Sequence, residues 1–228
     1  MEKKILIPVA YFRKLRLRNF NLLIANSSYL CNKVSRYNNS VEILYPFVDP
    51  IDSKKGSNDR KYLTFLNPSR EKGIRIFISI AEKLQNKSFM VVGKISSKNR
   101  MILQRMENVT YVPWTNEINK IYHDTRILLV PSISTETFGR VVIEAAQFGI
   151  PAIVSNQGGL PEAIGKSGLL VDNIFDVSEW LNNIQKFDDA QFYNSMSDEA
   201  RKHAKNFYTN NINQSFRSIL FRNFNLRF

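Results

Sequence analysis

The chain has 228 residues, of which 43% are hydrophobic and 12% aromatic. This length accommodates one large domain, or one domain with an appendage, and the apolar content excludes a disordered polypeptide. The single cysteine, Cys31, excludes a disulfide framework and a thiolate metal cluster; it indicates a reducing compartment, so we expect a cytoplasmic protein. The first apolar run, residues 5–12, is too short to cross a bilayer, and no signal-peptide cleavage pattern follows it.

The net charge of +12 is concentrated at the two ends of the chain. Residues 1–36 hold eight Lys or Arg and one acid, residues 201–228 hold six and none, and residues 37–200 hold eighteen against nineteen acids. A nucleic-acid-binding protein more often carries its basic stripe across the folded domain, so we expect no nucleic-acid partner. Basic ends favour docking to an anionic membrane face or an acidic partner. The alternative is solvated charge on two terminal helices.

The first fifty residues predict a small strand–helix–strand unit. Residues 1–20 fit an exposed strand or a basic arm, and residues 22–25 form a short apolar strand. A helix over residues 29–37 follows an N-cap signal in Asn26-Ser27-Ser28, and residues 41–48 read as a second strand. Residues 51–60 are polar, and we place a linker and a boundary there.

Residues 61–188 alternate between strand and helix patterns. Strands are predicted over residues 61–66, 88–92, 109–112, 127–130, 152–155 and 169–171, with helices over residues 73–85, 97–107, 117–125 and 178–186 between and after them. Continuous apolar strands in such an order predict an α/β fold, a Rossmann-like parallel sheet with helices on both faces. Ligands bind such sheets at the carboxyl ends of the strands.

The most informative stretch is residues 131–155, which follows the apolar strand that ends at Val130. A polar loop carries Glu136, and a helix opens near Phe138-Gly139 and carries Glu144 before it stops at Gly149. The free N–H groups of the first helical turn suit a phosphate, and glycine allows its close approach. The two carboxylates suit hydroxyl groups, which donate hydrogen bonds to them. A nucleotide sugar has both features.

The tail from residue 189 predicts two basic helices. Phe216, Leu220 and Phe224 lie four residues apart in the second one and give it an apolar stripe. We expect that stripe to pack onto the rest of the protein.

Three segments resemble, in order and spacing, the donor half of retaining nucleotide-sugar glycosyltransferases of the GT-B fold (glycosyl transferases group 1, family 4 type). They are F-L-N-P-S-R-E-K-G at residues 65–73, the Glu-x₇-Glu pair formed by Glu136 and Glu144, and N-Q-G-G-L-P-E at residues 156–162. The resemblance covers residues 22–187. It implies that the first fifty residues are the last piece of a truncated acceptor half, and that residues 189–228 are C-terminal helices.

The resemblance also assigns roles to individual residues. It implies that Glu144 binds the ribose hydroxyls, that Glu136 contacts the donor sugar, and that Lys72 neutralises the departing pyrophosphate. Glu136 and Lys72 are the catalytic candidates. The implied donor-binding set is Asn67, Arg70, Lys72, Gly93, Pro113, Trp114, Glu136, Thr137, Phe138, Gly139, Arg140 and Glu144.

Several of these positions have a second interpretation. Asn67 stands where the family usually has an arginine, and nearby Arg70 is a candidate substitute. Trp114 could stack on the base or pack in a core. Lys72 could be a solvated lysine at a helix start, although a cation opposes the helix dipole there and suggests a nearby anion. Glu162, just after Pro161, could serve only to begin a helix.

The sequence therefore predicts a retaining glycosyltransferase that binds a nucleoside-diphosphate sugar without a metal or other cofactor. Its acceptor would be a saccharide, a lipid or a protein, in polysaccharide or glycoconjugate biosynthesis. Catalysis could require a separate acceptor-domain subunit. The alternative function is a non-catalytic nucleotide-sugar-binding or regulatory or scaffolding subunit, docked through its basic ends. For either function we expect a cytoplasmic protein that could be peripheral at the inner face of the membrane.

Overall fold

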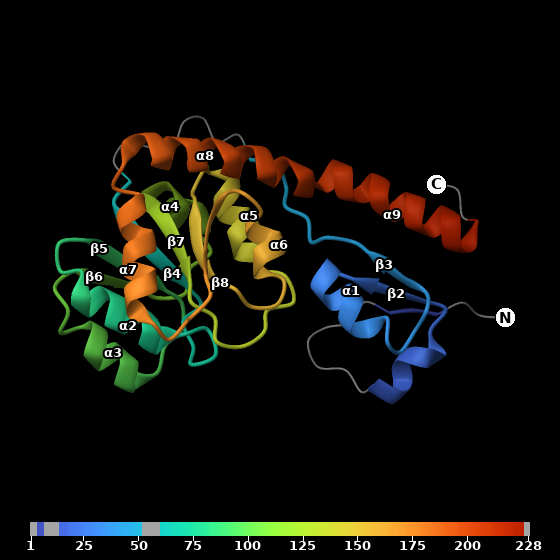
Figure 1. The fold of residues 1–228 in the computed structure, drawn as a ribbon, viewed down its shortest axis with the longest axis horizontal. Coiled ribbons are helices and arrows are strands. Elements are labelled where there is room, and N and C mark those ends of the chain that lie inside the picture. The colour runs from blue at the N-terminus through green and yellow to red at the C-terminus, as the bar shows by residue number, and fades with distance from the viewer. Residues whose placement is uncertain (1–3, 7–13, 52–59, 226–228) are drawn as a thin grey trace.

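Two parallel sheets form the protein, and a pair of C-terminal helices runs along both of them (Figure 1). The computed structural model describes residues 4–6, 14–51 and 60–225. The smaller sheet has the strand order β1-β2-β3, and the larger sheet has the order β6-β5-β4-β7-β8-β9. Every strand pair in both sheets is parallel.

The six-stranded sheet is buried on both faces along its four inner strands, and its two edge strands are partly exposed. Its strands are β4 (Tyr62–Leu66), β5 (Ser88–Val92), β6 (Val109–Val112), β7 (Thr125–Val130), β8 (Ala152–Ser155) and β9 (Gly168–Val171). Successive side chains of one strand enter two different cores: Ile127 and Leu129 pack in one, and Leu128 and Val130 in the other. This burial explains why the strands read as continuous apolar runs.

Six helices cover the two faces of this sheet. One face packs against α2 (Ile74–Lys83), α3 (Ser97–Leu103) and α7 (Val177–Lys186). The other packs against α4 (Ile118–Asp124), α5 (Arg140–Gln147) and α6 (Leu160–Ile164). The α/β prediction of a Rossmann-like sheet with helices on both faces is thereby confirmed.

The three-stranded sheet lies beside α6 in Figure 1. It consists of β1 (Ile5–Leu6), β2 (Leu22–Ala25) and β3 (Val41–Ile43), with a 3₁₀ helix (Lys14–Asn19) and helix α1 (Ser28–Val34). The side chain of Ser27 caps α1 by accepting a hydrogen bond from the N–H of Leu30. Leu17, Leu23, Leu30 and Val34 form the small core under α1.

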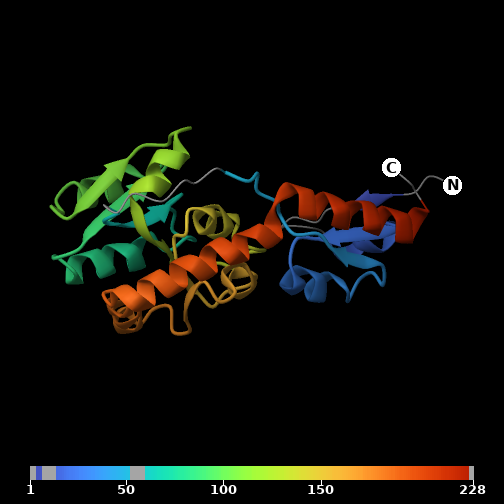
Figure 2. The ribbon, with the colours of Figure 1, turned by 90° about the horizontal axis from the view of Figure 1, so that it is seen from above.

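The C-terminal helices join the two sheets. Helix α8 (Ala190–Ala204) packs on α5 through Ala146, Ala200 and Ala204. A 3₁₀ turn (Lys205–Phe207) follows, and α9 (Thr209–Phe224) then crosses to the three-stranded sheet, as both views show (Figures 1 and 2). There Ile219 packs on Leu22 and Ile24. None of the helices in the described ranges has the length and apolar character needed to cross a membrane.

The chain passes between the sheets twice, and the two crossings are hydrogen-bonded to each other. The N–H of Val48 donates to the carbonyl of Phe207 at 2.9 Å, and the N–H of Thr209 donates to the carbonyl of Val48 at 3.2 Å. The prediction of a continuous strand over residues 41–48 was wrong, because β3 ends at Ile43 and only Val48 forms a further bridge. Pro46 lacks an N–H and cannot continue the ladder. The predicted linker lies mostly outside the described residues.

Candidate functional site

A pocket of about 340 Å³ lies at the carboxyl ends of the central strands. It is lined by Asn26, Pro46, Lys72, Val130, Glu136, Thr137, Phe138, Gly139, Arg140 and Val141. Six of these residues belong to the predicted donor-binding set, and they come from the loops that follow β4 and β7. The parallel sheet places both loops at the same edge, which is why residues 64 positions apart meet.

Lys72 and Glu136 form an ion pair inside this pocket. The carboxylate of Glu136 also accepts a hydrogen bond from Ser132 Oγ at 2.7 Å, and only 15% of its side chain is exposed. Lys72 keeps 39% of its side chain exposed. Within the described chain, the anion that the position of Lys72 suggested is therefore Glu136, and the ammonium group remains accessible to a bound phosphate.

The beginning of α5 forms the floor of the pocket. Gly139 is the N-cap with a φ of 113°, and no side chain caps the helix. A Cβ at this position would lie 2.6 Å from Leu160 Cδ2, so both the backbone conformation and the packing require glycine. The uncapped beginning of α5 and Glu136 line the same pocket, and free N–H groups at such a position suit an anion.

The G-G-L-P-E loop fixes the backbone of Glu136 from the next strand along. Gly159 N–H donates to the Glu136 carbonyl at 2.9 Å. Gly158 has a φ of 60°, and a Cβ there would lie 2.0 Å from that same carbonyl oxygen. The paired glycines are thus explained by the close approach of two loops, and they hold Glu136 in place.

Glu144 lies one turn further along α5, outside the residues that line the pocket. Arg140 Nε contacts one carboxylate oxygen at 2.9 Å, and the Tyr122 hydroxyl donates to the other at 3.0 Å. Burial, together with the neighbouring Glu144 charge, raises the pKa of Tyr122 well above its ordinary value of 10.0. Tyr122 therefore stays protonated and holds the carboxylate of Glu144 in one orientation.

The remaining predicted residues lie at strand ends but do not line this pocket. Asn67 and Arg70 are exposed in the loop after β4, and Gly93 follows β5. Pro113 and Trp114 follow β6, and Trp114 is 60% exposed, which rules out the core-packing interpretation of that residue.

Two pocket residues, Asn26 and Pro46, come from the N-terminal part of the chain and were not predicted. We call this pair the N-terminal wall of the pocket. Asn26 Nδ2 donates to Thr137 Oγ1 at 3.1 Å. Asn26 directly follows β2 and Pro46 lies three residues beyond the end of β3, so the rule about the carboxyl ends of strands applies to the small sheet as well.

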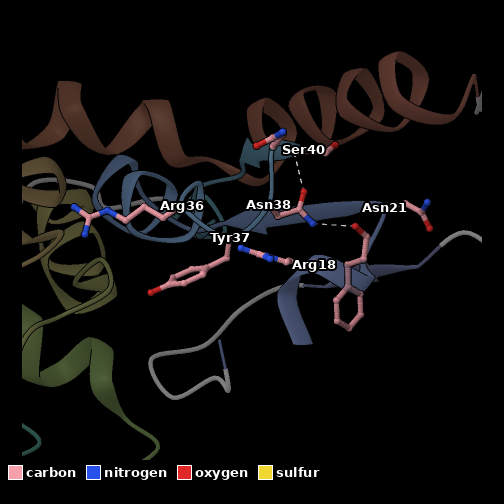
Figure 3. Close-up of a pocket in the computed structure, with 8 residues that line it drawn as sticks. Arg18, Asn21, Arg36, Tyr37, Asn38 and Ser40 are labelled. Carbon is pink, nitrogen blue, oxygen red and sulfur yellow. Dashed lines mark hydrogen bonds between the residues drawn. The ribbon is translucent and has the colours of Figure 1, made fainter. Parts of the chain in front are cut away.

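A second pocket, of about 530 Å³, lies at the opposite, amino ends of β2 and β3 (Figure 3). Asn38 lines it, but its amide is already bonded to the carbonyls of Leu17 and Phe20 and to the Ser40 N–H. The exposed Arg18 and Arg36 line the same pocket. It adds positive charge to the surface but lies away from Lys72 and Glu136. Across the described ranges, no cluster of His, Cys, Asp and Glu could hold a metal ion.

Comparisons with known proteins agree with this geometry. Residues 60–187 match the family model described as glycosyl transferases group 1. A D-inositol 3-phosphate glycosyltransferase of Paenarthrobacter aurescens (strain TC1) is 30% identical over 156 residues, covering 60% of this chain and 38% of that protein. The matched region thus spans well under two thirds of this curated relative.

Solved structures show the same fold. The crystal structure of Anabaena Alr3699/HepE in complex with UDP and glucose has a TM-score of 0.80 at 20% identity and covers 95% of this chain and 70% of that one. Sucrose-phosphate synthase (tll1590) from Thermosynechococcus elongatus has a TM-score of 0.77 at 22% identity and covers 92% and 59%. The family match extends over more than half of the chain, so this chain belongs to the glycosyl transferases group 1 family and has a GT-B-type fold.

Proposed function

We propose that the chain binds a nucleoside-diphosphate sugar and takes part in the transfer of its sugar, with retention of configuration, to a saccharide, lipid or protein acceptor in polysaccharide or glycoconjugate synthesis. The observation that carries the proposal is the meeting of Lys72 and Glu136 at the uncapped beginning of α5. A cation and free N–H groups suit the pyrophosphate, and the carboxylate suits the hydroxyl groups of the sugar.

In this proposal the donor rearranges the ion pair. The pyrophosphate attracts Lys72 away from Glu136, and the released carboxylate then accepts hydrogen bonds from the donor sugar. As the bond between sugar and phosphate breaks, negative charge grows on the leaving diphosphate. Lys72, nearby Arg70 and the first N–H groups of α5 stabilise that charge, so no metal is required. An acceptor hydroxyl attacks from the face that the leaving group occupies: its oxygen bonds to the sugar carbon as the bond to the diphosphate breaks, and the departing diphosphate oxygen takes the hydroxyl proton.

The nucleoside would lie toward Glu144 and Trp114. Glu144 is already oriented by Tyr122 and Arg140, which prepares its carboxylate to accept bonds from the ribose hydroxyls. The exposed indole of Trp114 can stack on the base. The Anabaena structure contains UDP, so uracil is the first base to test here.

Two functions are compatible with this pocket, and they differ in whether an acceptor can reach the donor sugar. The N-terminal wall closes one side of the pocket, which favours a role in transfer over mere storage of a nucleotide. We propose that an acceptor domain on a separate subunit completes the acceptor side of the pocket, to which the described N-terminal residues contribute Asn26 and Pro46. The second function is a non-catalytic nucleotide-sugar-binding or scaffolding subunit. Donor hydrolysis or transfer with a supplied acceptor domain separates the two functions.

We further propose that the chain is cytoplasmic and docks peripherally on an anionic membrane surface. The crossing of α9 to the three-stranded sheet supports this, because it brings the two basic ends of the sequence together (Figure 2). Lys4, Arg18, Lys33, Arg36 and Arg217 are exposed there. Glu42 and Asp49 are the two acids that the described segments of this region contain. Such a charge excess attracts anionic lipids.

Thermal unfolding with added nucleotides tests the binding site. UDP should raise the melting temperature, because a ligand that binds only the folded state stabilises it. Glu144→Ala should remove most of that shift, whereas Glu82→Ala, at an exposed carboxylate of α2, should leave it unchanged. The shift should survive a metal chelator. No stabilisation by UDP, GDP or ADP would rule out the proposal.

A further inference from the structure

Glu162 makes a concentrated contact between the two sheets that the proposed chemistry does not use. It lies at the beginning of α6, in the loop that follows β8. Its carboxylate accepts from the Ser28 N–H at 2.8 and 3.1 Å, from Ser28 Oγ at 2.5 Å and from the Tyr45 hydroxyl at 2.5 Å. Both partners belong to the N-terminal part of the chain.

The two partners of Glu162 are close chain neighbours of the N-terminal wall. Ser28 lies two residues after Asn26, and Tyr45 immediately precedes Pro46. Asn26 and Pro46 are the residues that this part of the described chain contributes to the pocket. One carboxylate therefore holds both of the short segments that carry the wall.

The ring of Tyr45 strengthens this connection. It packs against Phe138 with ring centres 5.7 Å apart and against Phe207 at 5.4 Å, and these two rings also touch each other. Phe138 precedes the N-cap of α5, and Phe207 belongs to the crossing that is bonded to Val48. A displacement of Tyr45 would therefore disturb Phe138, beside the beginning of α5, and Phe207, in the crossing between the sheets.

The hydrogen bonds to Glu162 contribute more than the hydrogen bond between Asn26 and Thr137, which is the other bond described between the wall and the large sheet. Hydrogen bonds to a charged acceptor contribute more than neutral ones, and the Asn26–Thr137 bond is neutral. Burial, followed by the hydrogen bond to Glu162, raises the pKa of Tyr45, so its hydroxyl remains a donor. Asn26 Oδ1 is buried and has no partner in the described part of the chain, and a ligand hydroxyl in the pocket would supply one.

We propose that Glu162 is a positioning residue that fixes the N-terminal wall against the donor pocket and so sets the affinity for the sugar part of the donor. This inference rests on the proposed function. Lys72 and the beginning of α5 hold the diphosphate independently of the wall. Loss of the Glu162 contacts should therefore weaken the binding of the nucleotide sugar more than the binding of the nucleoside diphosphate alone.

Calorimetry with the full chain tests this division. UDP-glucose, UDP-N-acetylglucosamine and GDP-mannose are compared first, and the one that binds most tightly is then measured beside its own nucleoside diphosphate. Glu162→Gln should weaken the binding of the nucleotide sugar about tenfold and the binding of the nucleoside diphosphate less than twofold. Tyr45→Phe keeps the ring contacts, loses the hydroxyl, and should give a smaller effect of the same kind. Glu162→Asp, which keeps the charge, should restore part of the loss.

The matched control is Glu42→Gln. Glu42 is also a partly buried carboxylate, but its bonds to Arg222 and Asn223 join β3 to α9, away from the pocket. An unchanged ratio of the two affinities in Glu162→Gln, or an equal change in Glu42→Gln, would overturn the inference.

Hydrogen exchange in the ligand-free chain gives a second test. Glu162→Gln should speed exchange in peptides that cover Ser28 and Tyr45, while Glu42→Gln should not. Unchanged exchange at both segments would overturn the inference. If the wild-type chain binds none of the nucleotides, the proposed function fails, and the exchange measurement still decides whether Glu162 holds the wall.

Discussion

At the scale of single residues, the site is a set of charges that hold one another in place. Lys72 and Glu136 are paired, Ser132 bonds Glu136, and the Tyr122 hydroxyl and Arg140 share Glu144. Glu144 is therefore oriented before a donor binds, whereas Lys72 must first leave Glu136. Preorganisation of this kind lowers the entropic cost of binding.

Tyr122→Phe tests the orientation of Glu144. The variant removes one hydrogen bond to a carboxylate, which is worth on the order of 1.5 kcal/mol, so UDP should bind roughly tenfold more weakly. The fold should be retained, because the ring stays packed on Phe148. Calorimetric titration with UDP measures the effect, and Tyr193→Phe on α8 is the control. Equal affinity in the wild type and Tyr122→Phe would show that Glu144 does not need this partner.

The raised pKa of Tyr122 also predicts a pH dependence. In the unfolded chain Tyr122 loses its proton near pH 10.0, whereas in the folded protein it keeps it. Its stabilising contribution is therefore complete below pH 10.0 and is lost as the pH rises from there toward the raised pKa. The melting temperature of Tyr122→Phe should fall less steeply above pH 10 than that of the wild type. Parallel curves would contradict this.

At the scale of the elements, two short helices present their beginnings to the same pocket region in different ways. Helix α5 is uncapped and begins at Gly139, and the pocket opens there. Helix α1 is capped by Ser27, and its first N–H is taken by Glu162. The difference assigns ligand binding to α5 and a structural role to α1.

Ser27→Ala tests the structural role of α1. Ser27 is completely buried, so the variant leaves the Leu30 N–H unpaired and should lower the free energy of unfolding by about 1 to 2 kcal/mol. Ser96→Ala removes the equivalent cap of α3 at an exposed position and should cost less, about 0.5 kcal/mol. Urea denaturation followed by circular dichroism measures both. A larger cost at Ser96 would contradict the assignment.

Most of the elements could be predicted from the sequence, because they are set by local patterns. Residues 22–25, 88–92, 109–112 and 152–155 are strands as predicted, and the first, second and fourth of these are the buried parallel strands that leave continuous apolar runs. The N-terminal wall could not be predicted. Asn26 reads as part of an N-cap signal and Pro46 as part of a strand. The place of Asn26 in the pocket depends on its contact with Thr137, 111 positions away.

Glu162 is a similar case. Its position after Pro161 predicts a helix beginning, which the structure has, but its partners Ser28 and Tyr45 are 134 and 117 residues away in the sequence. The roles of the donor-binding residues remain predictions, although six of the twelve lie together in one pocket.

At the scale of the whole molecule, the two C-terminal helices, α8 and α9, bring the basic ends of the sequence together. Helix α8 belongs to the large sheet, and α9 belongs to the small one, where Ile219 is buried and Arg222 bonds Glu42. The sequence predicted basic ends, and the fold brings those ends into one region (Figures 1 and 2). A membrane-docking surface is the consequence that can be tested.

Sedimentation with vesicles that contain anionic lipid tests the docking. The chain should bind at low salt and be released as salt rises, because exposed charges are screened. Arg18→Glu with Arg36→Glu should lower the partition coefficient at least tenfold, since each base near the surface contributes about 1 kcal/mol. Lys83→Glu with Arg105→Glu makes the same charge change on the large sheet and should matter much less. Binding that ignores salt would contradict the proposal.

The central claim is that Lys72 and the beginning of α5 form a diphosphate site beside Glu136, and titration of the chain with UDP and with uridine tests it most directly. We expect UDP to bind at least tenfold more tightly than uridine. We also expect Lys72→Gln to weaken the binding of UDP and to leave the affinity for uridine unchanged. Equal affinities for UDP and uridine, or a Lys72→Gln variant that binds UDP as well as the wild type, would contradict the account.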